Sequence, residues 1–104
     1  KGFLIIGSDN IVHNLRQISW SENEAPFEWA ASFDSWFKEN LKNKQFHDLA
    51  TKYLNHPEGK RSVPTSEHYL PALYAVGASR PDDTLNFITE EIQNGSISMT
   101  SFSF

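Results

Sequence analysis

Two histidines in this sequence stand where a neutral imidazole could bind a metal ion or move a proton. His13 closes a segment in which an apolar run, residues 3–6, is followed by a small polar turn. His68 lies in a second segment, residues 63–71, which is typical of the start of a helix. Histidine is the commonest protein metal ligand and the side chain best suited to proton transfer near neutral pH. We therefore predict a site at the edge of a sheet, where two α/β units begin.

Each histidine also has an ordinary structural interpretation. His13 would be a satisfied residue in the first turn of a helix, whose positive dipole end favours the neutral ring. His68 would be a capping-turn residue, and Glu67 would either orient its second ring nitrogen or be a solvated charge. His47 and His56 have polar neighbours in the sequence, and we interpret both as surface residues.

Other kinds of catalytic site find little support. Cysteine is absent, which excludes disulfides, thiolate catalysis and cysteine-ligated zinc. Ser8 follows a glycine, but the Gly-x-Ser-x-Gly pattern of a nucleophile elbow is not met. The adjacent acidic pairs, residues 82–83 and 90–91, do not form a carboxylate dyad, because neighbours on a strand point to opposite faces.

Composition also limits the partners. The formal net charge is −4 and no basic stripe exists, which argues against a nucleic-acid partner. No apolar run approaches the ~20 residues that a membrane helix needs, so no membrane partner is expected. The first residues do not resemble a signal peptide, and we expect a cytoplasmic protein.

The hydrophobic pattern predicts the elements that would position the histidines. The apolar run over residues 3–6 predicts a buried central strand. A helix is expected after Asn10, since apolar residues follow it at helical spacing. The strongest helix begins at Pro26, and its apolar stripe consists of Trp29, Phe33, Trp36, Phe37 and Leu41. A second helix is predicted over residues 45–54, followed by a charged loop over residues 55–61.

The last third of the chain predicts one further helix and a hairpin. The helix runs from Thr65 to about Val76, with Gly77 as its stop. Pro71 lacks an N–H and crowds the preceding turn, so the segment around His68 should be a separate turn or a kink. Asn94-Gly95 predicts a hairpin turn, with a bulge near Thr100 or Ser101. Together these elements predict an α/β fold, a three-layer piece with a mixed sheet and a C-terminal β-hairpin.

The chain begins almost directly with its apolar run. A fully apolar strand normally has neighbours on both sides. We therefore expect residues 1–104 to be the C-terminal part of a single catalytic α/β domain that continues in a longer chain.

Two long segments resemble hallmark motifs of one enzyme family. Residues 7–16 (GSDNIVHNLR) and residues 64–71 (PTSEHYLP) resemble segments of the class III extradiol ring-opening dioxygenases, in the DOPA 4,5-dioxygenase-like branch. Trp29 with Phe33 and Asp34, and residues 95–99 (GSISM), fit the same pattern, so the resemblance covers nearly the whole chain. It departs at Asp9, where the family usually has Gly. Aspartate tolerates left-handed backbone, so the turn could persist with an added negative charge near the site.

The resemblance implies roles for both histidines. His68 would be a metal ligand, and His13 would either contact the metal as well or act as the catalytic acid/base beside it. The family uses one divalent metal, Fe(II) or in some cases Zn(II), to open a catechol ring with O2. Two further metal-binding histidines belong to the N-terminal part of these enzymes. Without that part the ligand count is short, so the isolated chain is expected to bind metal weakly and to be inactive.

Three hypotheses follow for the function. The first is that the chain is part of a metal-dependent extradiol dioxygenase that cleaves a catecholic substrate with O2. The second is a non-catalytic α/β fragment or subunit with an incomplete metal site. The third is a zinc-dependent hydrolase on a related scaffold, which its metal and its lack of O2 consumption would distinguish.

Overall fold

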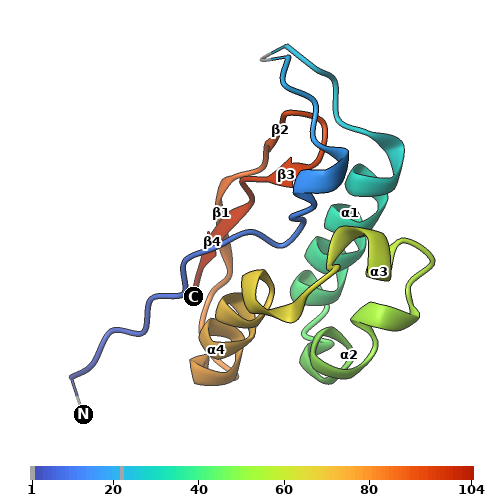
Figure 1. Cartoon of the computed structure of the whole chain (residues 1–104). Coiled ribbons are helices and arrows are strands. Elements are labelled where there is room, and N and C mark those ends of the chain that lie inside the picture. Colours follow the sequence, from blue (N-terminus) through green and yellow to red (C-terminus); the bar gives the residue numbers. More distant parts are fainter. Residues whose placement is uncertain (1, 22) are drawn as a thin grey trace.

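The computed structural model describes residues 2–21 and 23–104 (Figure 1). Within these residues, four α-helices and three short 3-10 turns precede a C-terminal hairpin. The helices are α1 (Glu28–Lys42), α2 (Phe46–Thr51), α3 (Gly59–Ser62) and α4 (Leu70–Ala78), and the 3-10 turns are η1 (Leu15–Gln17), η2 (Tyr53–Asn55) and η3 (Ser66–His68). The strands are β1 (Asn86–Thr89), β2 (Ile92–Gln93), β3 (Ile97–Ser98) and β4 (Ser101–Ser103). The chain thus combines helices with a small antiparallel hairpin, and every described helix is too short or too polar to cross a bilayer.

Helix α1 is the central helix of the fold, and the sequence predicted it correctly. Its aromatic residues recur every three or four positions and form one buried face. Glu28 in the first turn and Lys42 in the last complement the helix dipole. The helix begins at Glu28, two residues after the predicted start at Pro26.

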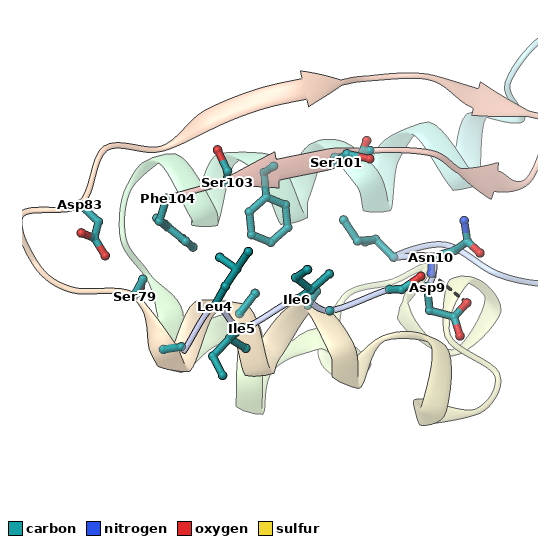
Figure 2. Close-up of a pocket in the computed structure, with 18 of the residues that line it drawn as sticks. Leu4, Ile5, Ile6, Asp9, Asn10, Ser79, Asp83, Ser101, Ser103 and Phe104 are labelled. Atoms are coloured by element: carbon teal, nitrogen blue, oxygen red, sulfur yellow. Dashed lines mark hydrogen bonds between the residues drawn. The ribbon is translucent and has the colours of Figure 1, made fainter. Parts of the chain in front are cut away.

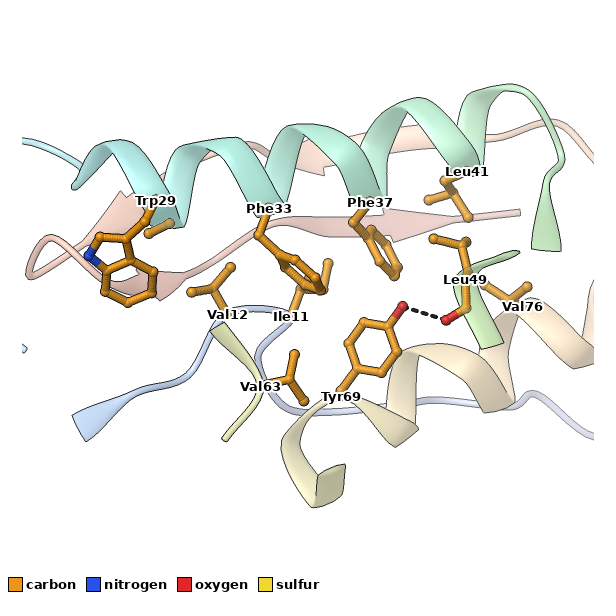
Figure 3. Close-up of a cluster of buried hydrophobic side chains, with 11 residues drawn as sticks. Ile11, Val12, Trp29, Phe33, Phe37, Leu41, Leu49, Val63, Tyr69 and Val76 are labelled. Atoms are coloured by element: carbon orange, nitrogen blue, oxygen red, sulfur yellow. Dashed lines mark hydrogen bonds between the residues drawn. The ribbon is translucent and has the colours of Figure 1, made fainter. Parts of the chain in front are cut away.

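The core forms where α1 faces α2, α4 and the segment that precedes η1 (Figure 3). Tyr69 is fully buried, and its ring packs against those of Phe33, Phe37 and Tyr53. Its hydroxyl donates a 2.7 Å hydrogen bond to the carbonyl of Leu49. Because a buried tyrosine must satisfy its hydroxyl, this bond fixes where the chain enters α4.

The hairpin turns at Asn94-Gly95, as predicted. Both residues have positive φ, 51° and 75°, which matches the twist of a tight hairpin turn. A side chain on Gly95 would also overlap the ring of Phe27. The pairing is interrupted in the middle, so β1 pairs with β4 and β2 pairs with β3.

The irregularity predicted near Thr100 or Ser101 lies on the opposite strand. The register shifts between Phe87 and Thr89, so the extra residue is Ile88 of β1. The alternation of apolar residues along the last strand indicated that a bulge was needed, but it did not specify which of the two strands carries the extra residue.

The buried central strand predicted for residues 3–6 is wrong for this structure. The segment is extended but pairs with no strand among the described residues, and its side chains are 53–86% exposed. It runs along a groove between α4 and β4 (Figure 2). An apolar run specifies a strand only when a neighbouring strand satisfies its backbone. The described residues supply none, and both two-stranded sheets are antiparallel, so the mixed three-layer sheet is not formed within residues 2–21 and 23–104.

The helix predicted after Asn10 is also wrong. Residues 11 and 12 lie in a bend, His13 forms an isolated β-bridge with Ile97, and the helical backbone begins only at Leu15, in the three-residue η1. Helical spacing of Ile11, Leu15 and Ile18 gave a false signal, because only Ile11 of these is buried in the core. Tertiary pairing with β3 therefore overrode the local pattern.

The remaining predictions were correct in outline. The helix predicted for residues 45–54 is divided into α2 and η2, and part of the expected charged loop forms α3. As Pro71 indicated, His68 belongs to a separate turn, η3, and not to α4. Gly77 does not end α4, which continues to Ala78.

A buried carboxylate ties the hairpin to α1. Asp34 is only 3% exposed and accepts hydrogen bonds from the hydroxyls of Ser98 (2.6 Å) and Thr100 (2.9 Å). Lys38 lies 3.3 Å from Asp34 and 3.3 Å from Glu90. Partial burial acts to lower the pKa of Lys38, but the two carboxylates outweigh it and raise that pKa above 10.5. The cluster therefore joins α1 to the hairpin through hydrogen bonds and ion pairs that share the carboxylate of Asp34.

We expect Asp34→Ala to lower the free energy of unfolding by roughly 2–4 kcal/mol, since two buried hydroxyls and an ammonium group lose their shared acceptor. Urea denaturation followed by circular dichroism would measure the change. The matched control is Glu39→Ala on the same helix, which removes an exposed pair with Lys42 and should cost less than about 1 kcal/mol. Equal effects of the two substitutions would contradict the assignment of Asp34 as the joint.

We expect Tyr69→Phe to lower the free energy of unfolding by about 1–2 kcal/mol, because the carbonyl of Leu49 loses a buried donor. Tyr74→Phe serves as the control, because Tyr74 is 73% exposed. If Tyr69→Phe left the free energy of unfolding unchanged, this hydrogen bond would not anchor the start of α4.

Candidate functional site

His13 is held in place by its own backbone. Its amide donates a 3.0 Å hydrogen bond to the carbonyl of Ser62, at the end of α3. On the other side, the amide of Ser98 donates to the carbonyl of Val12 at 3.1 Å, beside the bridge between His13 and Ile97. The segment is thus fixed between α3 and β3, with Val12 fully buried beneath it. His13 therefore does not lie at a helix N-terminus, as the sequence had suggested.

Asn14 completes this anchor and was missed as a site residue in the sequence. It is 6% exposed, its side-chain nitrogen donates to the carbonyl of Arg61 at 2.8 Å, and its oxygen accepts from the amide of Arg16 at 3.1 Å. The latter bond caps η1, a common role for asparagine. The signals in the sequence were its position directly after His13 and its place in the motif over residues 7–16.

His68 is placed by the residues that follow it. It ends η3, and the next residue is the fully buried Tyr69. The side chain of His68 remains 29% exposed. Since Tyr69 is fixed in the core and α4 begins at the next residue, Leu70, with Pro71 in its first turn, the backbone at His68 has little freedom to move.

The two histidine rings converge, although they are far apart in the sequence. Their centroids are 3.7 Å apart and their planes are inclined by 26°, so the rings are stacked. The arrangement brings together the two residues that the sequence analysis had singled out. Their assigned roles as metal ligand and catalytic acid/base stay predictions.

The stacking limits how the rings could share one ion. The lone pair of a neutral imidazole nitrogen lies in the plane of its own ring, and the planes of His13 and His68 face each other with their centroids 3.7 Å apart and an inclination of 26°. In this arrangement the lone pairs of the two rings do not converge on one point.

Two carboxylates flank the histidine pair. Asp9 Oδ2 lies 2.9 Å from His68 Nδ1, and Glu67 Oε1 lies 3.6 Å from His68 Nε2. Asp9 is not among the residues with positive φ, so the turn does not use the left-handed backbone that the sequence analysis considered. Its expected negative charge near the site is present. Glu67 accepts a 2.8 Å hydrogen bond from the Thr65 hydroxyl, and backbone and Thr65 hydrogen bonds lower the pKa of Glu67.

The surroundings favour a neutral His13. Partial burial, and after it the neighbouring His68, lower the pKa of His13 below 6.5, while Asp9 and Glu67 act in the opposite direction. A ring that is neutral near pH 7 can accept a proton or donate a lone pair. The electrostatics thus suit the proton-transfer chemistry that the sequence predicted.

A groove of about 710 Å³ reaches the site from the side of α4 (Figure 2). His68 and Asp9 lie on its wall, together with the apolar residues 3–6 and parts of α4 and β4. The groove could admit a small aromatic molecule to the exposed side of His68.

The other two histidines lie outside this cluster. His47 is exposed on α2, as predicted. His56 is half-buried, because its ring packs edge-on against Phe33, and its Nδ1 accepts the amide of Glu58 at 3.0 Å. The interpretation of His56 as a surface residue was therefore only partly right.

Comparison with known proteins supports the resemblance drawn from the two histidine motifs. The chain is 40% identical over 104 residues to a protein named 4,5-DOPA dioxygenase extradiol from Escherichia coli K12. It is 32% and 31% identical to proteins of the same name from Portulaca grandiflora and Beta vulgaris. These matches cover 97–100% of this chain but only 38% of each relative.

A solved structure shares the fold as well. The crystal structure of an uncharacterized protein from Escherichia coli K12 matches with a TM-score of 0.82 and 42% identity, over 90% of this chain and 39% of that one. No family model matches the sequence. Over nearly its whole length, this chain is homologous to a segment of the 4,5-DOPA extradiol dioxygenases.

Proposed function

We propose that this chain is the part of an extradiol dioxygenase that carries His13 and His68, and that the enzyme opens the ring of a catecholic substrate such as DOPA with O2. The names of the relatives support the reaction class. The observation that carries the proposal is the convergence of the two rings at 3.7 Å. We further assign the chain to the class III fold, in which residues 3–6 would join a mixed sheet completed by a segment outside this chain.

The residues present fit one side of a site for Fe(II) or Zn(II). Imidazole suits both ions, and His68 is partly exposed at the groove. Within the described part of the chain, no group of three or more histidine, aspartate or glutamate side chains could hold a metal ion. His68 would therefore supply one ligand, and the others would come from outside these residues. The bound ion would supply Lewis acidity and hold both reactants together.

His13 would move the proton in this scheme. Because its ring is stacked on that of His68, the lone pairs of the two rings do not converge on one point. Its lowered pKa keeps the ring neutral near pH 7, so it can accept the proton of a catechol hydroxyl at the adjacent position. This division of labour favours acid/base catalysis for His13 over metal ligation.

The two roles can be separated in a chimera. This chain would replace its homologous segment in the Escherichia coli relative, so that the remaining residues of the enzyme are supplied. With DOPA and Fe(II), we expect O2 uptake and formation of the ring-opened product. His68→Ala should abolish both metal retention and turnover, whereas His13→Gln should retain metal and lose roughly 10²–10⁴-fold in turnover.

His47→Ala is the matched control, since His47 is an exposed histidine outside the site. It should retain both metal and activity. If the chimera folds and binds metal but His68→Ala and His13→Gln turn over DOPA normally, the proposed roles are wrong. A folded, metal-bound chimera without any turnover would instead favour the alternative, a non-catalytic α/β module with an incomplete site.

The chain by itself should not open catechols. Because the described residues provide only part of a ligand set, we expect weak Zn(II) binding and no O2 uptake with DOPA and Fe(II). Isothermal titration calorimetry and an oxygen electrode would measure the two properties. Robust turnover by the 104 residues alone would refute the need for a second segment.

A further inference from the structure

We propose that Asp9 is a positioning residue that fixes the tautomer of His68, so that Nδ1 carries the proton and Nε2 is the nitrogen available to a metal ion. The proposal rests on the role suggested above for His68, but its first test requires neither metal nor turnover. The proposal gives a role in the site to Asp9, for which the family resemblance implied none.

The contact between Asp9 and His68 has hydrogen-bond geometry. The distance from Asp9 Oδ2 to His68 Nδ1 is 2.9 Å. An ionised carboxylate can only accept hydrogen bonds, so the neutral ring must place its proton on Nδ1 to make this contact. The lone pair of the neutral ring is then on Nε2. A carboxylate that orients a ligating histidine in this way strengthens metal binding.

The carboxylate is itself held in place. Asp9 Oδ1 accepts the amide of Asn10 at 3.0 Å, so both oxygens are engaged. The side chain of Asn10 donates a 2.7 Å hydrogen bond to the carbonyl of Ser98 on β3. On the other side, a side chain at Gly7 would overlap the carbonyl of Pro71, so the backbone there lies directly against α4. The loop is therefore attached to strand and helix on either side of Asp9.

Glu67 does not compete for the opposite tautomer. Its Oε1 lies 3.6 Å from His68 Nε2, which is too long for a hydrogen bond. The same oxygen already accepts the hydroxyl of Thr65 at 2.8 Å. Nε2 is thus the ring nitrogen without a close hydrogen-bond partner among the described residues, and His68 is on the wall of the groove.

The tautomer can be measured directly in this chain. Long-range ¹H–¹⁵N correlation spectra at mildly alkaline pH distinguish a protonated ring nitrogen from one with a lone pair. We expect wild-type His68 to be the Nδ1–H tautomer, and Asp9→Ala to shift it toward the Nε2–H form that free imidazole side chains favour. His68→Ala assigns the signals, and backbone spectra confirm that each variant is folded.

Zn(II) affinity provides the second readout. Loss of an orienting carboxylate should weaken Zn(II) binding roughly 10–100-fold in Asp9→Ala. Asp82→Ala is the matched control, because it removes the same charge from an exposed turn after α4 and should change neither readout. An effect of lost net charge alone would appear in Asp82→Ala as well.

The outcomes separate this inference from the proposed function. An Nε2–H tautomer in the wild type, or an unchanged tautomer in Asp9→Ala, would overturn the role of Asp9. Unchanged Zn(II) affinity in His68→Ala would overturn the ligand role of His68 and leave the tautomer result standing. A tautomer shift without loss of Zn(II) affinity in Asp9→Ala would overturn the functional part of the inference.

Discussion

The face-to-face contact between the rings of His13 and His68 is the constraint on which the site depends. Partial burial lowers the pKa of His13, and the neighbouring ring of His68, with its centroid 3.7 Å away, lowers it further, so the contact favours a neutral His13. The backbone on both sides enforces it, through the amide of His13 on Ser62 and the buried ring of Tyr69 next to His68. The neutral state that this contact favours therefore follows from where the backbone places the two rings.

The positions of both histidines depend on contacts with α1. The aromatic rings of α1 enclose Tyr69 and so locate the turn that carries His68. The carboxylate of Asp34 holds the hairpin, and β3 of that hairpin pairs with the segment that carries His13. One helix thus supports both halves of the site, which explains why a small chain can present two histidines from distant segments. The groove beside α4 then leaves His68 accessible.

The sequence predicted the elements whose signals are local. The aromatic repeat of α1, the turn at Asn94-Gly95 and the break at Pro71 each depend on neighbours in the chain. Residues 3–6 were misjudged because a strand requires a partner, and His13 because its pairing with β3 is long-range. The convergence of the histidines was expected mainly from the family resemblance, since spacing alone could not place them together. The contact between Asp9 and His68 depends on how the loop packs, which no local pattern encodes.

Gly7 shows how a residue without any functional group can govern the chemistry of this site. Its backbone approaches the carbonyl of Pro71 so closely that even a methyl group would displace the loop from α4. The loop carries Asp9, and the carboxylate would move with it. In a mutational scan, substitutions at position 7 would therefore reduce activity as strongly as substitutions of a metal ligand, although Gly7 contacts no reactant. The cause would be the short distance between the loop and α4.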